Sequence, residues 1–322
     1  MDVYRSLAEV PANFGPAALT IGNFDGVHYG HRTILKRVVA LAREKGWKAS
    51  VLTFDPHPAC VVAPERAPRL LTTPERRVEL MRDEGIDQVL ILPFTPELAR
   101  WTPEEFARQL LVARLTARAV LVGANFRFGN RQRGDVRVLA ELGRQLGFET
   151  IAIPAVSCRG RMVSSSAIRD AILAGRVALA ARLLRQAYGL EGAVVKGHGV
   201  GARQTVPTLN LSTQADVIPA RGVYITRTAD RDAAREWNSI TNVGFRPTFG
   251  DSHELSIETF LLEPLEEQPP HRIRVEFLCR VRDERQFESP EALKIQILKD
   301  VRVALAYFRR VKAWRVRRVA PV

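Results

Sequence analysis

The stretch TIGNFDGVHYGHRTIL, residues 20–35, passes from an apolar, strand-like run through a polar turn into a helix-like run. Apolar side chains recur at helical spacing as far as Leu41, and Gly46 then offers a helix end. The polar turn therefore precedes a predicted helix N-terminus, where free N–H groups and the helix dipole favour a phosphate. His28 and His31 lie at this point, which raises the question of whether the turn is catalytic.

The pattern around this turn repeats over residues 17–155. Helix starts are indicated at Thr73, at Thr102, where Glu105 completes a capping box, and at Asp135. Such alternation predicts an α/β domain with right-handed crossovers and a mostly parallel sheet covered on both faces. The five strand-like runs are AALTIG, ASVLTF, QVLILPF, RAVLVGANF and ETIAIPAV.

The second part of the chain has a different pattern. Two short helical stretches follow residue 156, and Ser289-Pro290 later begins a long amphipathic helix that reaches about Val311. We place the domain boundary between residues 187 and 188, which gives domains 1–187 and 188–322. Between the helices, four alternating segments predict a small antiparallel barrel or sandwich: GVYITRT, EWNSITNVG, LSIETFLLE and RIRVEFLCRV.

Composition limits the class of protein. The net charge of +13 over 322 residues suits an anionic partner: nucleic acid, a membrane surface or a phosphorylated small molecule. Three separated cysteines favour neither a disulfide framework nor a zinc cluster. The N-terminus lacks a signal-peptide pattern, and no apolar run is long enough to span a bilayer. We therefore expect a soluble, cytoplasmic protein and interpret the basic C-terminal stretch as a solvated helix end.

Three further motifs follow predicted strands or come shortly after one: DPHP, GANFRFG and VSSSAIR. Ligands of open α/β sheets bind beyond the carboxyl ends of the strands, so these motifs would share one rim with the first turn. Gly26 and Gly30 would let backbone approach a phosphate, and Arg169 with nearby hydroxyls suits a leaving polyphosphate. An isolated HxGH turn more often holds capping or core histidines, but this combination favours phosphate chemistry.

Polar residues also stand out in the second part. Residues 194–211 are glycine-rich, which is compatible with a phosphate nest or a hairpin turn, and the lysine of a P-loop is missing. Thr208 and Asn210 would project from one face of a strand, as a pair of oxygen ligands for Mg²⁺. Glu258 lies within an apolar alternation, where a carboxylate is costly unless it has a task or a partner.

Residues 22–31, VSSSAIR and GANFRFGNRQRGD resemble the HxGH nucleotidyltransferases, and most closely the FMN adenylyltransferase module of bacterial bifunctional riboflavin kinase/FAD synthetases. Asn125 stands where most members have aspartate. The resemblance continues through PTLN, RGVYITRT, TNVGFRPTFG, IETF and RVRDERQF, which are similar to a riboflavin kinase barrel. It implies a Rossmann-like N-terminal domain and a small C-terminal β-barrel with a terminal helix.

The resemblance also implies roles for individual residues. His28, His31 and Glu258 would be catalytic, and Thr208 and Asn210 would bind Mg²⁺. The residues expected to bind ATP and its phosphates are Gly22, Asn23, Phe24, Gly30, Asn125, Ser164, Ser165, Ser166, Arg169, Gly197, Gly199 and Gly201. Those expected to bind flavin are Asp55, Pro56, His57, Pro58, Phe126, Phe128, Arg282, Glu284 and Phe287.

The function implied is phosphorylation of riboflavin to FMN by ATP, followed by adenylylation of FMN to FAD with release of pyrophosphate. The partners would be ATP, riboflavin and FMN, without nucleic acid or membrane, and a weak or transient oligomer is compatible with the sequence. The kinase half departs from the family pattern where Ala202 is inserted, at QPPH in residues 268–271, and at Phe260.

Two alternatives remain open. The departures in the kinase half favour an FMN adenylyltransferase whose barrel is a degenerate, flavin-binding module. The charge of +13 and the arginine-rich tail favour a basic RNA- or DNA-binding protein on an α/β scaffold.

Overall fold

The computed structural model describes residues 1–195, 208–247, 253–265 and 268–319, and it divides into two compact units, Met1–Ala167 and Ile168–Val322. The expected boundary at residues 187 and 188 followed the change in sequence pattern and stays a prediction. The units divide earlier because helix α8 (Val177–Leu184) packs against strands of the second unit. Helix α7 (Ser165–Leu173) begins at the end of the first unit.

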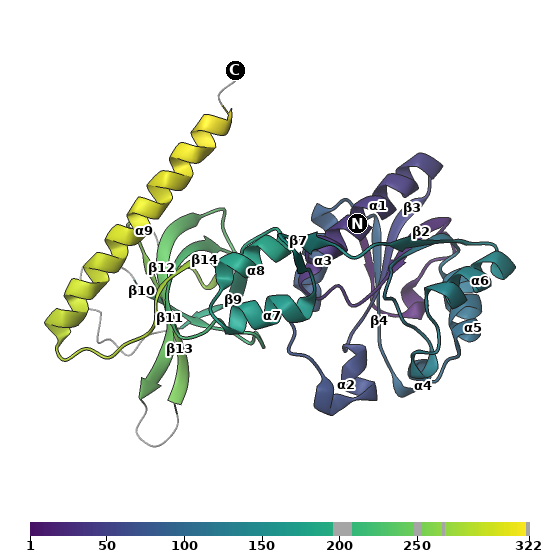
Figure 1. Cartoon of the computed structure of the whole chain (residues 1–322), viewed down its shortest axis with the longest axis horizontal. Helices are drawn as coiled ribbons and strands as arrows, with labels where there is room; N and C mark the ends of the chain where they lie inside the picture. The colour runs from purple at the N-terminus through teal and green to yellow at the C-terminus, as the bar shows by residue number, and fades with distance from the viewer. Residues whose placement is uncertain (196–207, 248–252, 266–267, 320–322) are drawn as a thin grey trace. The chain divides into compact units, whose positions relative to one another are not determined.

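The first unit contains a six-stranded parallel sheet in the order β1-β4-β3-β2-β5-β6. This confirms the predicted α/β domain. Figure 1 labels β2, β3 and β4 of this sheet. The short strand β1 was not predicted, because three residues are too few to show the alternation of apolar and polar side chains that indicates a strand. The strands are β1 (Asp2–Tyr4), β2 (Ala17–Ile21), β3 (Lys48–Phe54), β4 (Gln88–Leu92), β5 (Ala117–Gly123) and β6 (Glu149–Ile153), and β7 (Ser157–Cys158) and β8 (Arg161–Met162) form a separate hairpin.

The helices of the first unit begin and end largely where their capping residues predict. Gly46, with φ of 67°, ends α1, and the Asp135 carboxylate accepts two backbone N–H groups at the start of α6. Thr102 and Glu105 form the predicted capping box, but the chain then continues as a π-helix over Phe106–Arg114. The helices are α1 (Tyr29–Lys45), α2 (Pro58–Val62), α3 (Pro74–Asp83), α4 (Pro96–Ala99), α5 (Pro103–Glu105) and α6 (Val136–Leu146).

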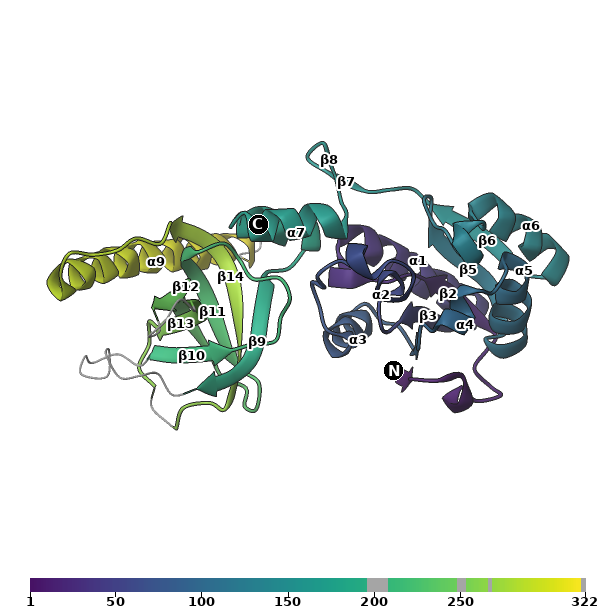
Figure 2. The same cartoon turned by 90° about the horizontal axis from the view of Figure 1, so that it is seen from below.

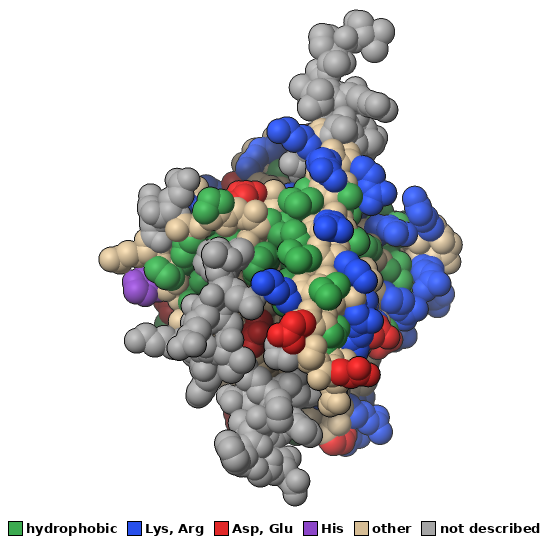
Figure 3. All heavy atoms as spheres, turned by 90° about the vertical axis from the view of Figure 1, so that its left-hand side faces the viewer, with side chains coloured by type: hydrophobic (Ala, Val, Ile, Leu, Met, Phe, Trp, Pro, Cys, Tyr) green, Lys and Arg blue, Asp and Glu red, His purple; other side chains and the backbone are tan. Residues whose placement is uncertain are grey.

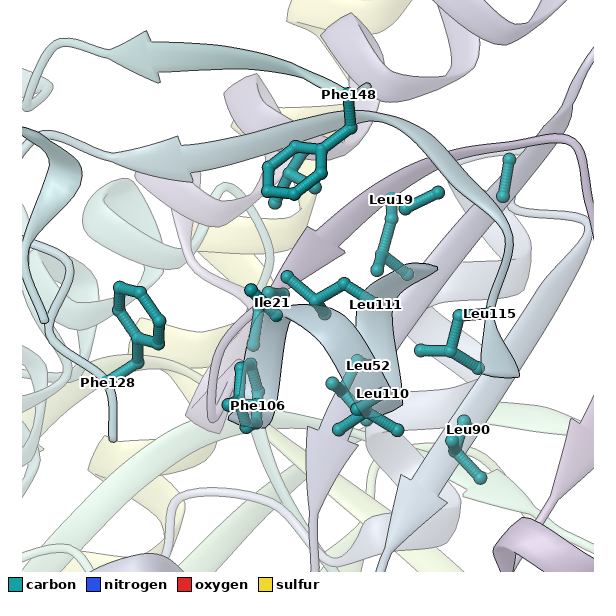
Figure 4. Packing of buried hydrophobic residues seen from close by; sticks show 14 of the residues in the cluster. Leu19, Ile21, Leu52, Leu90, Phe106, Leu110, Leu111, Leu115, Phe128 and Phe148 are labelled. Carbon is teal, nitrogen blue, oxygen red and sulfur yellow. The ribbon is translucent and has the colours of Figure 1, made fainter. Parts of the chain in front are cut away.

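Both faces of this sheet are buried, as near-continuous apolar strands require. One face packs Leu19 and Leu52 against Phe106 and Leu110 of the segment that follows α5 (Figure 4). The other face packs against α1 and α3 through side chains such as Leu35. Two covered faces leave the loops at the strand ends as the place for a ligand.

The second unit is a closed antiparallel barrel with strand order β10-β13-β12-β11-β14-β9. The sequence pattern allowed either a barrel or a sandwich, and the structure shows a closed barrel. Its interior combines Tyr224 and Phe277 with buried hydroxyls that bond one another, among them Thr226 with Thr241 at 2.8 Å. The strands are β9 (Tyr188–Val195), β10 (Thr208–Ser212), β11 (Gly222–Asp230), β12 (Glu236–Pro247), β13 (His253–Leu261) and β14 (Arg272–Arg282).

The terminal helix α9 (Pro290–Val319) runs along the outside of this barrel in both ribbon views (Figures 1 and 2). Ala304 packs there against Val223, Ile225 and Ile240. Figure 3 shows that α9 also exposes hydrophobic side chains between lysines and arginines. The exposed apolar residues of α9 include Leu293, Ile295, Ile297, Leu298, Val303 and Leu305.

Within the described parts of the chain, no helix combines the length and the apolar character needed to cross a membrane.

Candidate active sites

The turn between β2 and α1 has an unusual backbone. Phe24 and Val27 have φ values of 51° and 38°, and Gly26 between them has φ of 79°. Positive φ is uncommon outside glycine, and for a β-branched residue such as Val27 it is a conformational outlier. Such a turn persists only where its surroundings hold it in place.

Those surroundings include the segment that leads into α3. The buried Asp25 carboxylate accepts hydrogen bonds from the backbone N–H groups of Leu71 and Thr72, at 2.8 and 3.2 Å. The Thr72 hydroxyl in turn accepts the Gly26 N–H at 3.0 Å. From the other side, the Ser165 hydroxyl donates to the main-chain oxygen of Asp25 at 2.9 Å. The turn is therefore tied to two distant parts of the sequence.

His28 caps the N-terminus of α1. Its Nδ1 accepts the backbone N–H of His31 at 3.3 Å, and the two imidazole rings stack with centroids 3.6 Å apart. Because Nδ1 is an acceptor, the neutral ring carries its proton on Nε2. That N–H remains available as a hydrogen-bond donor toward a ligand.

Burial disfavours the protonated form of both histidines. Burial lowers the pKa of His28 to about 4, against a smaller opposing effect of a backbone hydrogen bond. The pKa of His31 lies well below its usual value because of burial and, secondly, because of the nearby His28. Among the described residues, the buried Nδ1 of His31 has no hydrogen-bond partner. The Nε2–H of His28 can thus offer a hydrogen bond to an anion.

The motif after β3 lies beside this turn, since β3 neighbours β2 in the sheet. The side-chain amide nitrogen of Asn23 is 2.8 Å from Nε2 of His57. His57 caps α2 by accepting the N–H of Ala59 at 3.1 Å. Two expected motifs, GNFDGVHYGH and DPHP, are thus in direct contact. His57 lies between the exposed Pro56 and the half-buried Pro58, and Asp55 is also half-buried.

The motif after β5 comes from the other neighbour of β2. Asn125 is exposed, as a residue that meets a soluble nucleotide should be. Phe126 and Phe128 stack at 5.5 Å, but Phe128 is only 6% exposed and packs against Phe106 in the core. Of the two aromatic residues expected to bind flavin, the half-buried Phe126 is therefore the more accessible.

The serine motif begins helix α7. The Ser164 hydroxyl accepts the backbone N–H of Ala167 at 3.2 Å, Ser165 holds the first turn, and Ser166 is exposed. Arg169 follows within α7 and is half-buried. Of this motif, the structure connects Ser165 directly to the HxGH turn.

A second polar group lies on the outer face of the barrel. Asn210 of β10 and Asn242 of β12 lie directly opposite Glu258 of β13, and Thr208 lies two residues from Asn210 on the same face. The alternate residues Leu209 and Thr259 point into the core. The three residues expected from the kinase resemblance thus share one surface. Ser256 adds a hydrogen bond to the Glu258 carboxylate at 3.0 Å.

The other residues expected to bind flavin lie after β14. The Glu284 carboxylate fills the space that a side chain at Gly244 would occupy, so it lies near the face that carries Glu258. Arg282 pairs with the buried Asp300 of α9 at 2.9 Å and lies 5.6 Å from the ring centre of Phe287. Arg282 therefore anchors α9 whether or not it also meets flavin. Gly197, Gly199 and Gly201 lie outside the described residues.

No three His, Cys, Asp or Glu side chains among the described residues are grouped as a metal site. Thr208 and Asn210 instead offer neutral oxygens beside one carboxylate. That donor set fits Mg²⁺, which usually keeps waters and substrate phosphates among its ligands.

Sequence reasoning missed residues that support these sites, notably Asp25, Thr72, Arg77 and Ser256. Asp25 lies within the quoted turn, but only the tertiary fold shows that it is buried. Arg77 reads as a solvent-facing residue of a charged helix, yet it is 2% exposed. No periodic signal distinguishes it from its neighbour Arg76.

Comparison with known proteins covers both halves of the chain. The FAD synthetase family model matches residues 10–167, and the riboflavin kinase family model matches residues 184–308. A bifunctional riboflavin kinase/FMN adenylyltransferase from Pseudomonas fluorescens is 34% identical, covering 95% of this chain and 97% of that protein. The protein of the same name from Escherichia coli K12 is 32% identical, and the match covers 90% of this chain and 92% of that protein. The one from Bacillus subtilis is 30% identical, and the match covers 91% of this chain and 92% of that protein.

The fold is also similar to that of a solved structure. A crystal structure described as a macrolide-efflux protein from Streptococcus pneumoniae superposes with a TM-score of 0.83 at 25% identity, and the match covers 94% of this chain and 97% of that one. Both halves of the chain thus occur together, in this order, in related proteins. The chain belongs to the family of bifunctional riboflavin kinase/FMN adenylyltransferases.

Proposed function

We propose that two separate groups of residues carry out the two reactions of this bifunctional riboflavin kinase/FMN adenylyltransferase. The outer face around Glu258 phosphorylates riboflavin to FMN, and the turn around His28 adenylylates FMN to FAD. The pairing of Asn210 with Glu258 across adjacent strands is the observation that carries the kinase assignment. The capping geometry of His28, which leaves Nε2–H free, carries the adenylyltransferase assignment.

In the adenylyltransferase reaction, a phosphate oxygen of FMN attacks the α-phosphorus of ATP. The bond from that phosphorus to the bridging oxygen breaks, and pyrophosphate leaves with the electron pair. The nucleophile is already an anion, so alignment and charge stabilisation are what the protein must supply. His28 donates from Nε2, and the N-terminus of α1 adds backbone N–H groups. Burial disfavours the protonated form of both histidines, and hydrogen-bond donation is the role that we assign to His28.

Around the same turn, we assign ATP and its phosphates to Gly22, Asn23, Phe24, Gly30 and Asn125. Ser164, Ser165, Ser166 and Arg169 would receive the leaving pyrophosphate. Residues 55–58 and Phe126 would contact FMN, since His57 touches Asn23. The buried Phe128 would act by supporting Phe126 through their ring stack.

In the kinase reaction, the nucleophile is a neutral ribityl hydroxyl, which must lose a proton. Glu258 accepts that proton as the hydroxyl oxygen attacks the γ-phosphorus of ATP and ADP leaves. Ser256 keeps the carboxylate oriented through its hydrogen bond. Thr208 and Asn210 would hold Mg²⁺, which neutralises charge on the phosphates when it is bound. Glu284 and Phe287, with Arg282, would contact riboflavin.

An assay of the products tests this division. Wild-type protein with riboflavin, Mg²⁺ and ATP should form FMN and then FAD, resolved by chromatography. Absence of both products, with FAD still formed from supplied FMN, would favour the degenerate-barrel alternative. The cytoplasmic setting, the absence of nucleic-acid and membrane partners, and a weak oligomer stay predictions.

Two substitutions separate the sites. We expect His28→Ala to abolish FAD formation and leave FMN formation intact, because it removes the phosphate donor of one unit only. We expect Glu258→Gln to abolish FMN formation and leave FAD formation from supplied FMN intact. His271→Ala and Glu263→Gln, at exposed positions, are the matched controls. FAD formation at the wild-type rate by His28→Ala would contradict the site assignment.

A further inference from the structure

Arg77 of α3 is a buried arginine beneath the HxGH turn. It is 2% exposed, and its Nη1 donates to the main-chain oxygen of Asn23 at 2.8 Å. The same nitrogen lies 3.4 Å from the Thr53 hydroxyl and 3.5 Å from the main-chain oxygen of Phe54. One side chain therefore meets the loop after β2 and the end of β3, which lead into the GNFDGVHYGH and DPHP motifs.

For a buried charged group, Arg77 has few hydrogen-bond partners. Among the described residues no carboxylate forms an ion pair with it, and its Nε and Nη2 have no hydrogen-bond partner. Burial lowers the pKa of Arg77, while the more distant charges of Asp25, Asp55 and Glu75 act in the opposite direction. An apolar side chain of similar length would be cheaper to bury. Packing alone does not account for a guanidinium here.

The turn above Arg77 is the one with the strained backbone at Phe24 and Val27. Asp25 reaches from the turn to Leu71 and Thr72 in the segment that leads into α3, and Arg77 reaches from α3 back to Asn23. The two elements therefore hold each other through bonds in both directions. Hydrogen bonds of this kind can maintain a costly backbone conformation at a functional site.

We propose that Arg77 is a positioning residue for FAD formation: it fixes the main chain at Asn23 and Phe54, and thereby the place of the His28 Nε2–H relative to ATP. Arg77 itself does not reach substrate. This inference rests on the proposed role of His28. The loss of Arg77 would displace a donor that matters most in the transition state.

Arg77→Met, which keeps the length and removes the guanidinium, is the primary test. We expect kcat for FAD formation from FMN to fall about 10²-fold, the size that a misplacement of roughly 1 Å produces. The KM values for ATP and FMN should stay within about threefold, because ground-state contacts remain. FMN formation from riboflavin by the same chain should be unchanged.

Arg77→Lys is the second variant, because an ammonium can bond Asn23 but lacks the planar fork of guanidinium. We expect a kcat between those of wild type and Arg77→Met. Arg82→Met, an exposed arginine of the same helix, is the matched control and should keep the wild-type rate. Thermal melting of each variant reports the folded fraction to which kcat is normalised.

Wild-type kcat in folded Arg77→Met would overturn the proposal, as would a loss that only matches the unfolded fraction. If Arg77→Met does not fold, Arg77→Lys decides, and wild-type kcat there would also overturn it. His28→Ala is measured alongside. An impaired His28→Ala with an unaffected Arg77 variant rejects this inference alone, whereas an active His28→Ala rejects the site itself.

Discussion

A histidine that caps a helix commits one ring nitrogen to the backbone and keeps the other for a ligand. Nδ1 of His28 is bonded in this way, and the ring of His31 stacks against that of His28. Burial in this place disfavours the protonated form of both imidazoles. Their chemistry is that of fixed dipoles, which suits stabilisation of charge that develops on phosphate oxygens.

The low pKa of His28 predicts a pH-dependent stability. Its value of about 4 in the folded chain lies below 6.5, so the unfolded chain binds the proton first as the pH falls. The stability contributed by neutral His28 is therefore present above pH 6.5 and lost toward pH 4. The largest effect is about 3 kcal/mol.

His28→Asn tests this, since asparagine also caps helices but does not titrate. Hydrogen exchange of α1, corrected for the intrinsic rate at each pH, should show a steeper loss of protection between pH 6.5 and 4.5 in wild type than in the variant. Equal pH slopes would contradict the prediction.

At the scale of elements, Gly30 lies in the first turn of α1, two residues after the capping His28. A Cβ at this position would lie 3.2 Å from Cε1 of His28, a contact tighter than most. Alanine is otherwise the better helix residue, by about 1 kcal/mol. The glycine thus favours the placement of the imidazole over the stability of the helix.

Gly30→Ala should therefore separate activity from stability. We expect kcat for FAD formation to fall at least several-fold because the imidazole is displaced, while the melting temperature does not fall, since helix propensity offsets the contact. FMN formation by the same chain serves as the internal control. A lower melting temperature together with an unchanged rate of FAD formation would contradict this prediction. Gly30 would then matter for the stability of the chain and not for the placement of the imidazole.

At the scale of the whole molecule, each compact unit has its own core, and His28 and Glu258 of the two proposed sites lie in different units. We expect a mixture of His28→Ala and Glu258→Gln chains to convert riboflavin to FAD, because each chain supplies the unit that the other lacks and FMN diffuses between them. Chromatography of the time course should show FMN before FAD. Accumulation of FMN without FAD would instead indicate that FMN passes only within one chain.

Several features could be predicted from local sequence. The capping residues Thr102 and Asp135 and the end of α1 at Gly46 were correct, because a cap depends on neighbours within a few residues. The motifs at the ends of β2, β3 and β5 were also located correctly, since parallel strands share their carboxyl edge. The π-helix after Glu105 was missed, because its pattern of apolar residues resembles that of an α-helix.

The sequence by itself determined the alternation of strands and helices, the polar turn with His28 and His31, and the placement of Thr208 and Asn210 on one face. These depend on periodicity and capping within short segments. Only the tertiary structure decided that the barrel closes, that Asn210 pairs with Glu258, and that Arg77 bonds to the main chain of the HxGH turn. Those outcomes depend on contacts between distant segments, whose free energies come from burial and hydrogen bonds that no local pattern encodes.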